Sequence, residues 1–256
     1  MPLVERERKP PALILRLNRP DKRNALSRDL IAALHEAFSE ARADASRVVI
    51  LTANGPAFCA GMDLAELAAC LDLADAEAAI ARDAQRLSDL YELVYTLPKP
   101  TIAVVQGPAV AGGAGLVSVC DLAVASQEAR FGYPEVRRGL VAAIVMPHLL
   151  RHVGERAARD LLLRGELVDA WTAWRIGLIN EVADDPSALA YEWARQLAQA
   201  APQALASTKA LLQRLAARVP REETVWGSAA ARLTIECREG LRAFLDKRPP
   251  PWATSS

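Results

Sequence analysis

Short apolar runs of strand length recur in the first half of the chain. The run at 11–17, PALILRL, follows a shorter charged segment at 3–8, and turn residues at 18–21 end it. The run at 47–52, RVVILT, is β-branched and apolar on both faces, which is typical of a parallel strand covered on both sides. Segments 101–105 and 121–126 have the same character. These runs predict strands of a buried sheet.

Segments with helical periodicity separate the predicted strands. Ser27 is a candidate N-cap, and the helix after it places apolar residues on one face, namely Leu30, Ile31, Leu34, Phe38 and Ala41. Asp63 and Glu66 have the spacing of a capping box for a second helix. A longer helix is predicted over 74–96, and the prolines at 98 and 100 stop it. Alternating strands and helices predict an α/β fold with helical crossovers between parallel strands.

The pattern changes after Val182, where strand-like runs cease. Segments 186–200, 202–217 and 221–245 are rich in Ala, Leu and Arg and predict helices. We place a boundary near residue 200, with a core at 1–200 and a C-terminal helical oligomerisation region at 201–256. Broad apolar helix faces appended to an α/β core often pack on another subunit, so a homo-oligomer is expected.

Composition narrows the classes of partner. The 31 Lys and Arg residues balance the 31 Asp and Glu residues, so no net field attracts nucleic acid or an acidic membrane surface. No apolar run reaches the roughly 18 residues of a membrane span, and no secretory segment is evident at the N-terminus. The four cysteines stand apart and are expected to be buried, reduced thiols. A soluble cytoplasmic protein without metal is therefore expected; His148 and His152, four residues apart, are interpreted as partly exposed helical residues.

The glycine-rich segment at 101–121 is the strongest local signal for chemistry. Gly107 and Gly112 have the spacing that begins a P-loop, but Gly113 and Ala114 stand where phosphate binding needs Lys and Ser or Thr. The glycines do not fit a dinucleotide-binding GxGxxG pattern, and no GxSxG nucleophile elbow exists. Nucleotide chemistry and serine hydrolysis are thus disfavoured.

Two glycine turns remain, and both suit backbone donors. The first amides of a helix are unpaired and lie at its positive end, so the turn before Gly112 can stabilise a carbonyl oxygen that becomes negative. The turn at 58–63 has the same form and would leave the Met62 amide free while Asp63 caps the next helix. The backbone amides of Met62 and Gly112 are therefore predicted to form an oxyanion hole. Close packing of a helix on a strand would also explain such turns.

Several spaced motifs together resemble one known family. They are FCAGMD at 58–63, GPAVAGG at 107–113, CD at 120–121, FGYPE at 131–135, NRPDKRNAL at 18–26 and FLDKRP at 244–249. In this order they resemble the crotonase (enoyl-CoA hydratase/isomerase) superfamily, and the bacterial enoyl-CoA hydratases in particular, over essentially the whole chain. The resemblance implies an α/β spiral of ββα units with a C-terminal helical trimerisation region, assembled as a homotrimer or as a homohexamer built from two trimers.

The resemblance also implies a ligand and its contacts. Members bind an acyl-CoA thioester, hold its carbonyl in a two-amide oxyanion hole and stabilise an enolate; the matching amides are those of Met62 and Gly112. Coenzyme A is part of the substrate, and no permanently bound cofactor is implied. Its contacts fall on Lys22, Arg23, Ala25, Ala60 and Asp63, and on Phe244 and Lys247 of a neighbouring subunit. For the lysines and arginine, a solvated surface is the competing interpretation.

The catalytic acids distinguish family members, and here the chain departs from the two-carboxylate pattern. Gly115 stands where hydratases carry their first Glu, and Ala143 stands at a third position that is acidic in some relatives. Glu135 matches the second Glu, and its apolar neighbours are expected to raise its pKa. The expected substrate pocket contains Leu67, Gly115, Ala142, Ala143, Ile144 and part of 70–84.

Three functions fit these residues. The first is hydration of a 2-enoyl-CoA thioester through an enolate, which we favour from the resemblance and because Gly115 is expected to leave space for water. The second is Δ3,Δ2-enoyl-CoA isomerisation, in which Glu135 alone moves a proton between Cα and Cγ. The third is an acyl-CoA-binding protein without catalysis.

Overall fold

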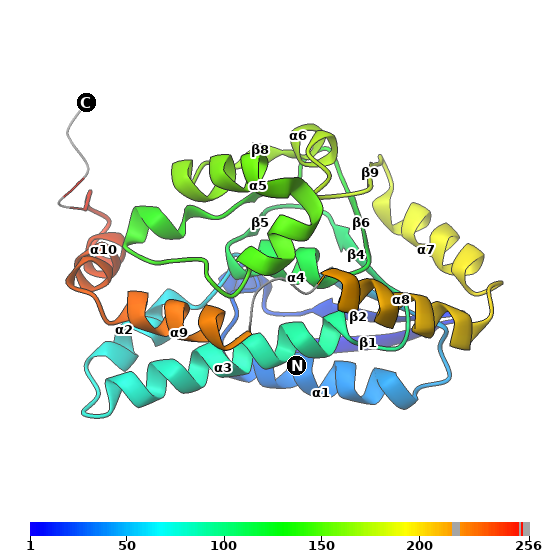
Figure 1. The fold of residues 1–256 in the computed structure, drawn as a ribbon, viewed down its shortest axis with the longest axis horizontal. Coiled ribbons are helices and arrows are strands. Elements are labelled where there is room, and N and C mark those ends of the chain that lie inside the picture. Colours follow the sequence, from blue (N-terminus) through cyan, green and yellow to red (C-terminus); the bar gives the residue numbers. More distant parts are fainter. Residues whose placement is uncertain (217–220, 251, 253–256) are drawn as a thin grey trace.

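The main sheet is mostly parallel. The computed structural model describes residues 1–216, 221–250 and 252 (Figure 1). Its strands, in spatial order, are β1 (Val4–Lys9), β2 (Ala12–Leu17), β3 (Val48–Ala53), β4 (Thr101–Val105), β6 (Leu122–Ala125) and β9 (Glu181–Val182). The β1–β2 pair is antiparallel, whereas the pairs from β2 to β9 are parallel. The strands predicted at 3–8, 11–17, 47–52, 101–105 and 121–126 are confirmed within a residue or two.

A second, smaller sheet supports the candidate site. It contains β5 (Ala109–Val110), β7 (Arg130–Gly132) and β8 (Val168–Asp169) in that order. The pairing of β5 with β7 places Val110 opposite Gly132. The glycine turn after β4 and the segment before Glu135 therefore lie side by side.

Helices fill the crossovers and the C-terminal third of the chain. They are α1 (Arg28–Ala43), α2 (Leu64–Leu71), α3 (Ala76–Tyr95), α4 (Gly112–Val119), α5 (Met146–Arg164), α6 (Ala170–Arg175), α7 (Pro186–Leu197), α8 (Pro202–Ala216), α9 (Arg221–Arg232) and α10 (Ile235–Leu245). Two 3-10 helices are η1 (Pro20–Lys22) and η2 (Pro134–Arg138). The prediction of one helix over 221–245 is wrong, because Thr234 accepts a hydrogen bond from the Cys237 amide and begins a separate helix.

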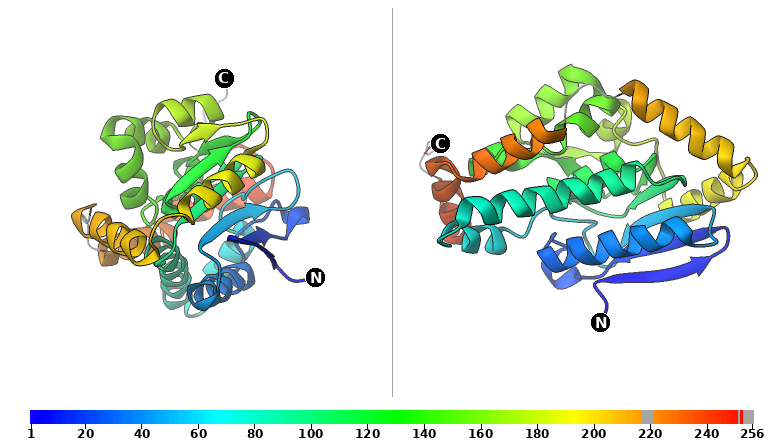
Figure 2. Two further views of the ribbon diagram at one scale, coloured as in Figure 1. Left: turned by 90° about the vertical axis from the view of Figure 1, so that its right-hand side faces the viewer. Right: turned by 60° about the horizontal axis from the view of Figure 1, so that its bottom comes forward.

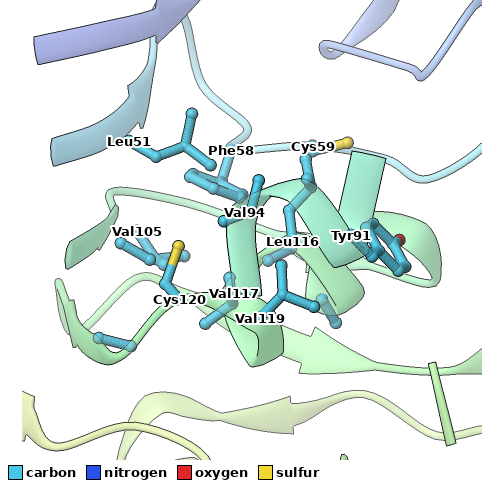
Figure 3. Packing of buried hydrophobic residues seen from close by; sticks show 14 of the residues in the cluster. Leu51, Phe58, Cys59, Tyr91, Val94, Val105, Leu116, Val117, Val119 and Cys120 are labelled. Atoms are coloured by element: carbon cyan, nitrogen blue, oxygen red, sulfur yellow. The ribbon is translucent and has the colours of Figure 1, made fainter. Parts of the chain in front are cut away.

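The two faces of the main sheet are buried in different clusters. On one face, Ile50, Ile102 and Val124 pack with Ala190 and Ala194 of α7. The other face packs against α1, α3 and α4, which belong to the main core. Figure 3 shows Leu116, Val117 and Val119 of α4 among side chains from the surrounding strands and α3. Each large apolar side chain that is fully buried contributes about 1.5–3 kcal/mol, so α4 is held firmly against the sheet.

The predicted helix caps are partly confirmed. The Ser27 Oγ accepts from the Leu30 amide at 3.2 Å, and Asp63 accepts from the amides of Ala65 and Glu66. The reciprocal half of the capping box is wrong. Glu66 Oε2 instead accepts from the Arg28 amide at 2.9 Å, so it caps the start of α1.

The C-terminal helices α9 and α10 fold back onto earlier elements of the same chain. Figure 2 shows α9 lying along α3, and α10 packs against η2 and α2. Two glycines permit the contact with η2: a Cβ on Gly240 would lie 2.4 Å from the Arg138 carbonyl oxygen, and one on Gly139 would lie 2.5 Å from the Glu236 carbonyl carbon. The proposed boundary near residue 200 stays a prediction.

Candidate active site

The turn before α2 is shaped by close packing at Gly61. Gly61 has a φ of +87°, and a Cβ there would lie 2.8 Å from the Ala111 Cβ and 2.9 Å from the Val110 carbonyl oxygen. Only glycine satisfies both the left-handed backbone and this contact. The turn carrying Met62 is therefore pressed directly against the turn before α4.

The turn before α4 is strained as well as tightly packed. Ala111 has φ 54° and ψ −124°, a region that residues with a Cβ rarely adopt, and its amide donates to the Gly132 carbonyl at 2.8 Å. A Cβ on Gly113 would lie 2.2 Å from the Cys59 carbonyl oxygen. Neighbouring strands and the Gly61 turn thus force the orientation of the Gly112 peptide.

Met62 and Gly112 each present an amide at this junction. A Cβ on Gly61 would lie 3.3 Å from the Gly112 nitrogen, which shows how close the two turns are. Within the described part of the chain, neither the Met62 amide nor the Gly112 amide donates to a protein acceptor. Gly112 is the first residue of α4, where an amide has no partner in its own helix. Both amides are free to donate to a ligand.

Glu135 lies on η2, which follows strand β7 of the small sheet. The residue is partly exposed, but its Oε2 atom is buried and has no hydrogen-bond partner. Burial raises the pKa of Glu135 to about 7, and the charges of Arg138 and Arg232 oppose that rise. A carboxyl with this pKa is well suited to giving and taking a proton near neutral pH.

One cavity, with a volume of about 1200 Å³, brings most of the predicted residues together. That volume exceeds what a drug-sized ligand requires and suits a large thioester. The predicted residues that line it are Lys22, Arg23, Ala25, Ala60, Met62, Asp63, Gly112, Glu135, Ala142, Ala143, Ile144 and Phe244.

Three predicted residues do not line this cavity. Leu67 packs inside a separate apolar cluster with Cys70 and Ile80, and Lys247 is exposed beyond α10. Gly115 is enclosed, because a Cβ there would lie 2.4 Å from the Tyr91 hydroxyl and 2.6 Å from a Val145 methyl group. The expectation that Gly115 leaves space for water is therefore wrong.

Phe244 lines the cavity of its own chain. The reason is the return of α10 onto η2, where the Arg138 guanidinium lies 4.7 Å from the centre of the Phe244 ring. A cation over an aromatic face is attracted by the ring's negative face. The expected contact of Phe244 with the site of a neighbouring subunit stays a prediction.

Asp63 has a structural role in addition to its predicted contact with the ligand. Its Oδ2 pairs with Arg19 Nη1 at 2.7 Å while its Oδ1 caps α2. Arg19 in turn donates to the Ala25 carbonyl at 3.1 Å. This ion pair ties the loop that holds Lys22 and Arg23 to the turn that holds Met62.

Sequence reasoning missed two arginines and a tyrosine. Arg138 and Arg232 line the cavity, and each has a buried nitrogen without a partner. Tyr91 Oη donates to the Gly112 carbonyl at 2.6 Å. A lone arginine in the alanine-rich stretch before residue 233 was the available signal for Arg232, but the periodicity of a helix does not reveal which helix it will contact.

The histidines and cysteines show no sign of a metal centre. His148 is buried rather than partly exposed, and burial lowers its pKa to about 3. His152 Nε2 lies 2.8 Å from the Ser118 carbonyl oxygen. All four cysteines are buried free thiols, and no cluster that could hold a metal occurs in the described ranges. In those ranges, no helix is both long and apolar enough to cross a membrane.

Comparison with known proteins finds relatives that agree with one another in their family. Residues 9–255 match the family described as enoyl-CoA hydratase/isomerase. A Thermus thermophilus protein named as an enoyl-CoA hydratase is 45% identical over 240 residues, covering 91% of this chain and 94% of the relative. The 2,3-dehydroadipyl-CoA hydratase of Escherichia coli is 36% identical over 261 residues, covering 97% and 96%.

A solved structure extends the agreement to the fold. An enoyl-CoA hydratase from Mycobacterium avium has 35% sequence identity and a TM-score of 0.87, covering 98% of this chain and 99% of that chain. The motifs, the mixed α/β architecture and these matches agree over nearly the full length. The chain therefore belongs to the enoyl-CoA hydratase/isomerase family of enzymes, the crotonase superfamily, and has its fold.

Proposed function

We propose that this protein hydrates a 2-enoyl-CoA thioester. The observation that carries the proposal is the common cavity of two free amides, those of Met62 and Gly112, and the unpartnered buried oxygen of Glu135. Relatives named as hydratases support the same reaction. The free amides would donate hydrogen bonds to the thioester carbonyl oxygen and stabilise the negative charge of an enolate.

Glu135 alone can carry both proton transfers of hydration. Its carboxylate takes one proton from water while the water oxygen bonds to Cβ, and the electrons of the double bond move to the thioester oxygen. The protonated Glu135 then delivers that proton to Cα as the enolate collapses. Water is added overall, and a pKa near 7 allows both the basic and the acidic step.

Isomerisation is the second candidate, because a single carboxyl suits it equally well. Glu135 would take a proton from Cα of a 3-enoyl thioester and return it to Cγ of the same enolate. Neither reaction draws support from Gly115, whose surroundings are filled by Tyr91 and Val145.

Two substrates separate the candidates. Crotonyl-CoA and 3-hexenoyl-CoA are offered separately, and the absorbance of the conjugated enoyl thioester is followed. Hydration removes that absorbance from crotonyl-CoA, whereas isomerisation creates it from 3-hexenoyl-CoA. Activity on 3-hexenoyl-CoA alone would contradict the proposal. Binding of both without turnover would indicate a protein that binds acyl-CoA without catalysis.

The acyl group and the assembly are also proposals. The Escherichia coli relative is named for a dehydroadipyl thioester, so acid-terminated acyl groups are candidates beside alkyl ones. A homotrimer or homohexamer is supported by the exposed Leu211, Leu212 and Leu215 of α8, which leave an apolar ridge in a single chain. Light scattering of the purified protein tests the assembly; a monomeric mass would contradict it.

A further inference from the structure

Arg232 is a buried cation in the wall of the cavity. It ends α9, is 5% exposed, and lines the same cavity as Met62 and Glu135. Its Nη2 lies 3.0 Å from the Met62 sulfur, while its Nη1 is buried and has no hydrogen-bond partner. A guanidinium offers five N–H donors in a planar fork, and a methionine sulfur is a weak acceptor. The hydrogen-bonding capacity of Arg232 is therefore largely unused.

Nearby acidic groups do not neutralise this cation by direct pairing. Asp83 on α3 is engaged by Arg28, with Nη2 to Oδ2 at 2.8 Å and Nε to both oxygens at 3.0 Å. Glu135 on η2 and the thiols of Cys70 and Cys237 also face Arg232. Among the described residues, no carboxylate forms an ion pair with Arg232.

An unpaired buried cation is costly unless a ligand completes it. Burial lowers the pKa of Arg232, yet arginine remains protonated in proteins. Removing a charge from water without a partner costs several kcal/mol. A carboxylate binds the guanidinium fork through two parallel hydrogen bonds, which makes it the chemically matched partner.

The surroundings of Arg232 indicate that it would contact the acyl end of the substrate and not the coenzyme A end. The Met62 side chain that Arg232 touches belongs to the residue whose amide is proposed to hold the thioester carbonyl. The residues beside Arg232 on its other flank, Ala229 and Leu233, pack in the apolar cluster that contains Leu71 and Ile80. The basic residues Lys22 and Arg23 line the same cavity but, unlike Arg232, are exposed, and they suit the phosphates of coenzyme A.

We propose that Arg232 binds a second carboxylate at the far end of the acyl group, so that the preferred substrates are mono-CoA thioesters of unsaturated dicarboxylic acids. This inference rests on the proposed hydration. It assigns to Arg232 the selection of the substrate rather than a part in the proton transfers.

The test compares thioesters that differ only at the acyl terminus. The CoA thioesters of 2-pentenoic, 2-hexenoic and 2-octenoic acids are each paired with the 2-enedioic acid of the same carbon number. We expect kcat/KM of the wild type to favour the acid-terminated member tenfold or more at one length at least. Arg232→Met, which keeps an unbranched, flexible side chain and removes the charge, should abolish or reverse that preference, and Arg232→Lys should retain part of it.

Arg242→Met is the matched control, because Arg242 is exposed on α10 and pairs with Glu239. It should leave the preference unchanged. An equal loss in both series on Arg232→Met would mean that Arg232 only positions Met62, and it would overturn the inference. If Arg232→Met does not fold, the wild-type kinetics alone test the inference. A wild-type preference for the methyl-terminated thioester at every length would also overturn it.

Failure of the inference and failure of the proposed function give different results. Hydration of methyl-terminated substrates without any preference for acids would leave the proposed function intact and overturn the inference. If neither series is hydrated, the proposed function fails, and calorimetric titration with the same pairs then tests Arg232. Tighter binding of the acid-terminated thioesters would still support the inference, and equal or weaker binding would refute it.

Discussion

The Tyr91 hydroxyl donates a 2.6 Å hydrogen bond to the Gly112 carbonyl oxygen, and it also occupies the space beside Gly115. Tyr91 is fully buried in the main core. One side chain from α3 thus fixes the start of α4, where the free Gly112 amide lies, and fills the volume that a side chain at position 115 would need. The absence of a first glutamate is coupled to the packing of Tyr91.

Tyr91→Phe should lower kcat by up to about tenfold with little change in KM. The substitution removes a hydrogen bond worth about 0.5–1.5 kcal/mol and loosens residue Gly112, whose amide is the proposed oxyanion donor. Steady-state kinetics on crotonyl-CoA measure the effect. Tyr95→Phe is the control on the same helix, since the Tyr95 ring packs against His148 and Arg151. Equal losses in the two variants would argue against the role of Tyr91.

Gly115→Ala should destabilise the fold by about 1–3 kcal/mol, because the added methyl group meets Tyr91 and Val145 well inside contact distance. Gly115→Glu should be worse, and it should not create a two-carboxylate site. Thermal denaturation provides the measurement. Gly227→Ala is the matched control, since its Cβ would lie at an ordinary 3.5 Å from Ala143. A Gly115→Ala protein as stable as the wild type would show that the enclosure is not rigid.

Glu135→Gln should reduce kcat by about 10²–10⁴, because the amide cannot exchange a proton with water or Cα. Affinity for a non-reactive saturated acyl-CoA, measured by calorimetry, should change little. In the wild type, kcat/KM for hydration should rise with pH through about 7 and then level off, because the free enzyme needs the carboxylate. Full activity of Glu135→Gln would remove Glu135 from the mechanism.

Glu135 should also make stability depend on pH. Its pKa is about 7 in the folded state against an ordinary value of 4.5, so the folded protein favours the protonated form. Its favourable contribution is complete below pH 4.5 and declines as pH rises through 7, by about 3 kcal/mol in all. The stability of Glu135→Gln relative to wild type should therefore increase between pH 5 and pH 8. Urea unfolding at both values tests this, and a difference independent of pH would contradict the raised pKa.

Asp63→Ala should lower the free energy of unfolding by about 2–3 kcal/mol. It removes both the cap of α2 and the partner of Arg19, whose side chain is 21% exposed. Asp185→Ala removes a cap alone, the bond from the Ala188 amide at 2.9 Å, and should cost about 1 kcal/mol. Chemical denaturation of the two variants gives the comparison. Equal costs would indicate that the Arg19 pair contributes little.

Local chemistry explains why much of this protein could be read from its sequence. Strand-length apolar runs identified the main sheet, and side chains such as Ser27 marked helix starts because a cap contacts amides only two or three residues away. The two glycine turns indicated free amides for the same reason, and the motif spacing indicated the family and Glu135.

Contacts between distant segments required the tertiary structure. Glu66 has the spacing of a local cap, yet it bonds the Arg28 amide because α1 and α2 begin near each other. Gly115 and Tyr91 are 24 positions apart, and nothing in either segment shows that one fills the space beside the other. Arg232 enters the cavity only because α9 lies along α3. Helical periodicity defines which side chains share a face, but the partner of that face is decided by packing over the whole chain.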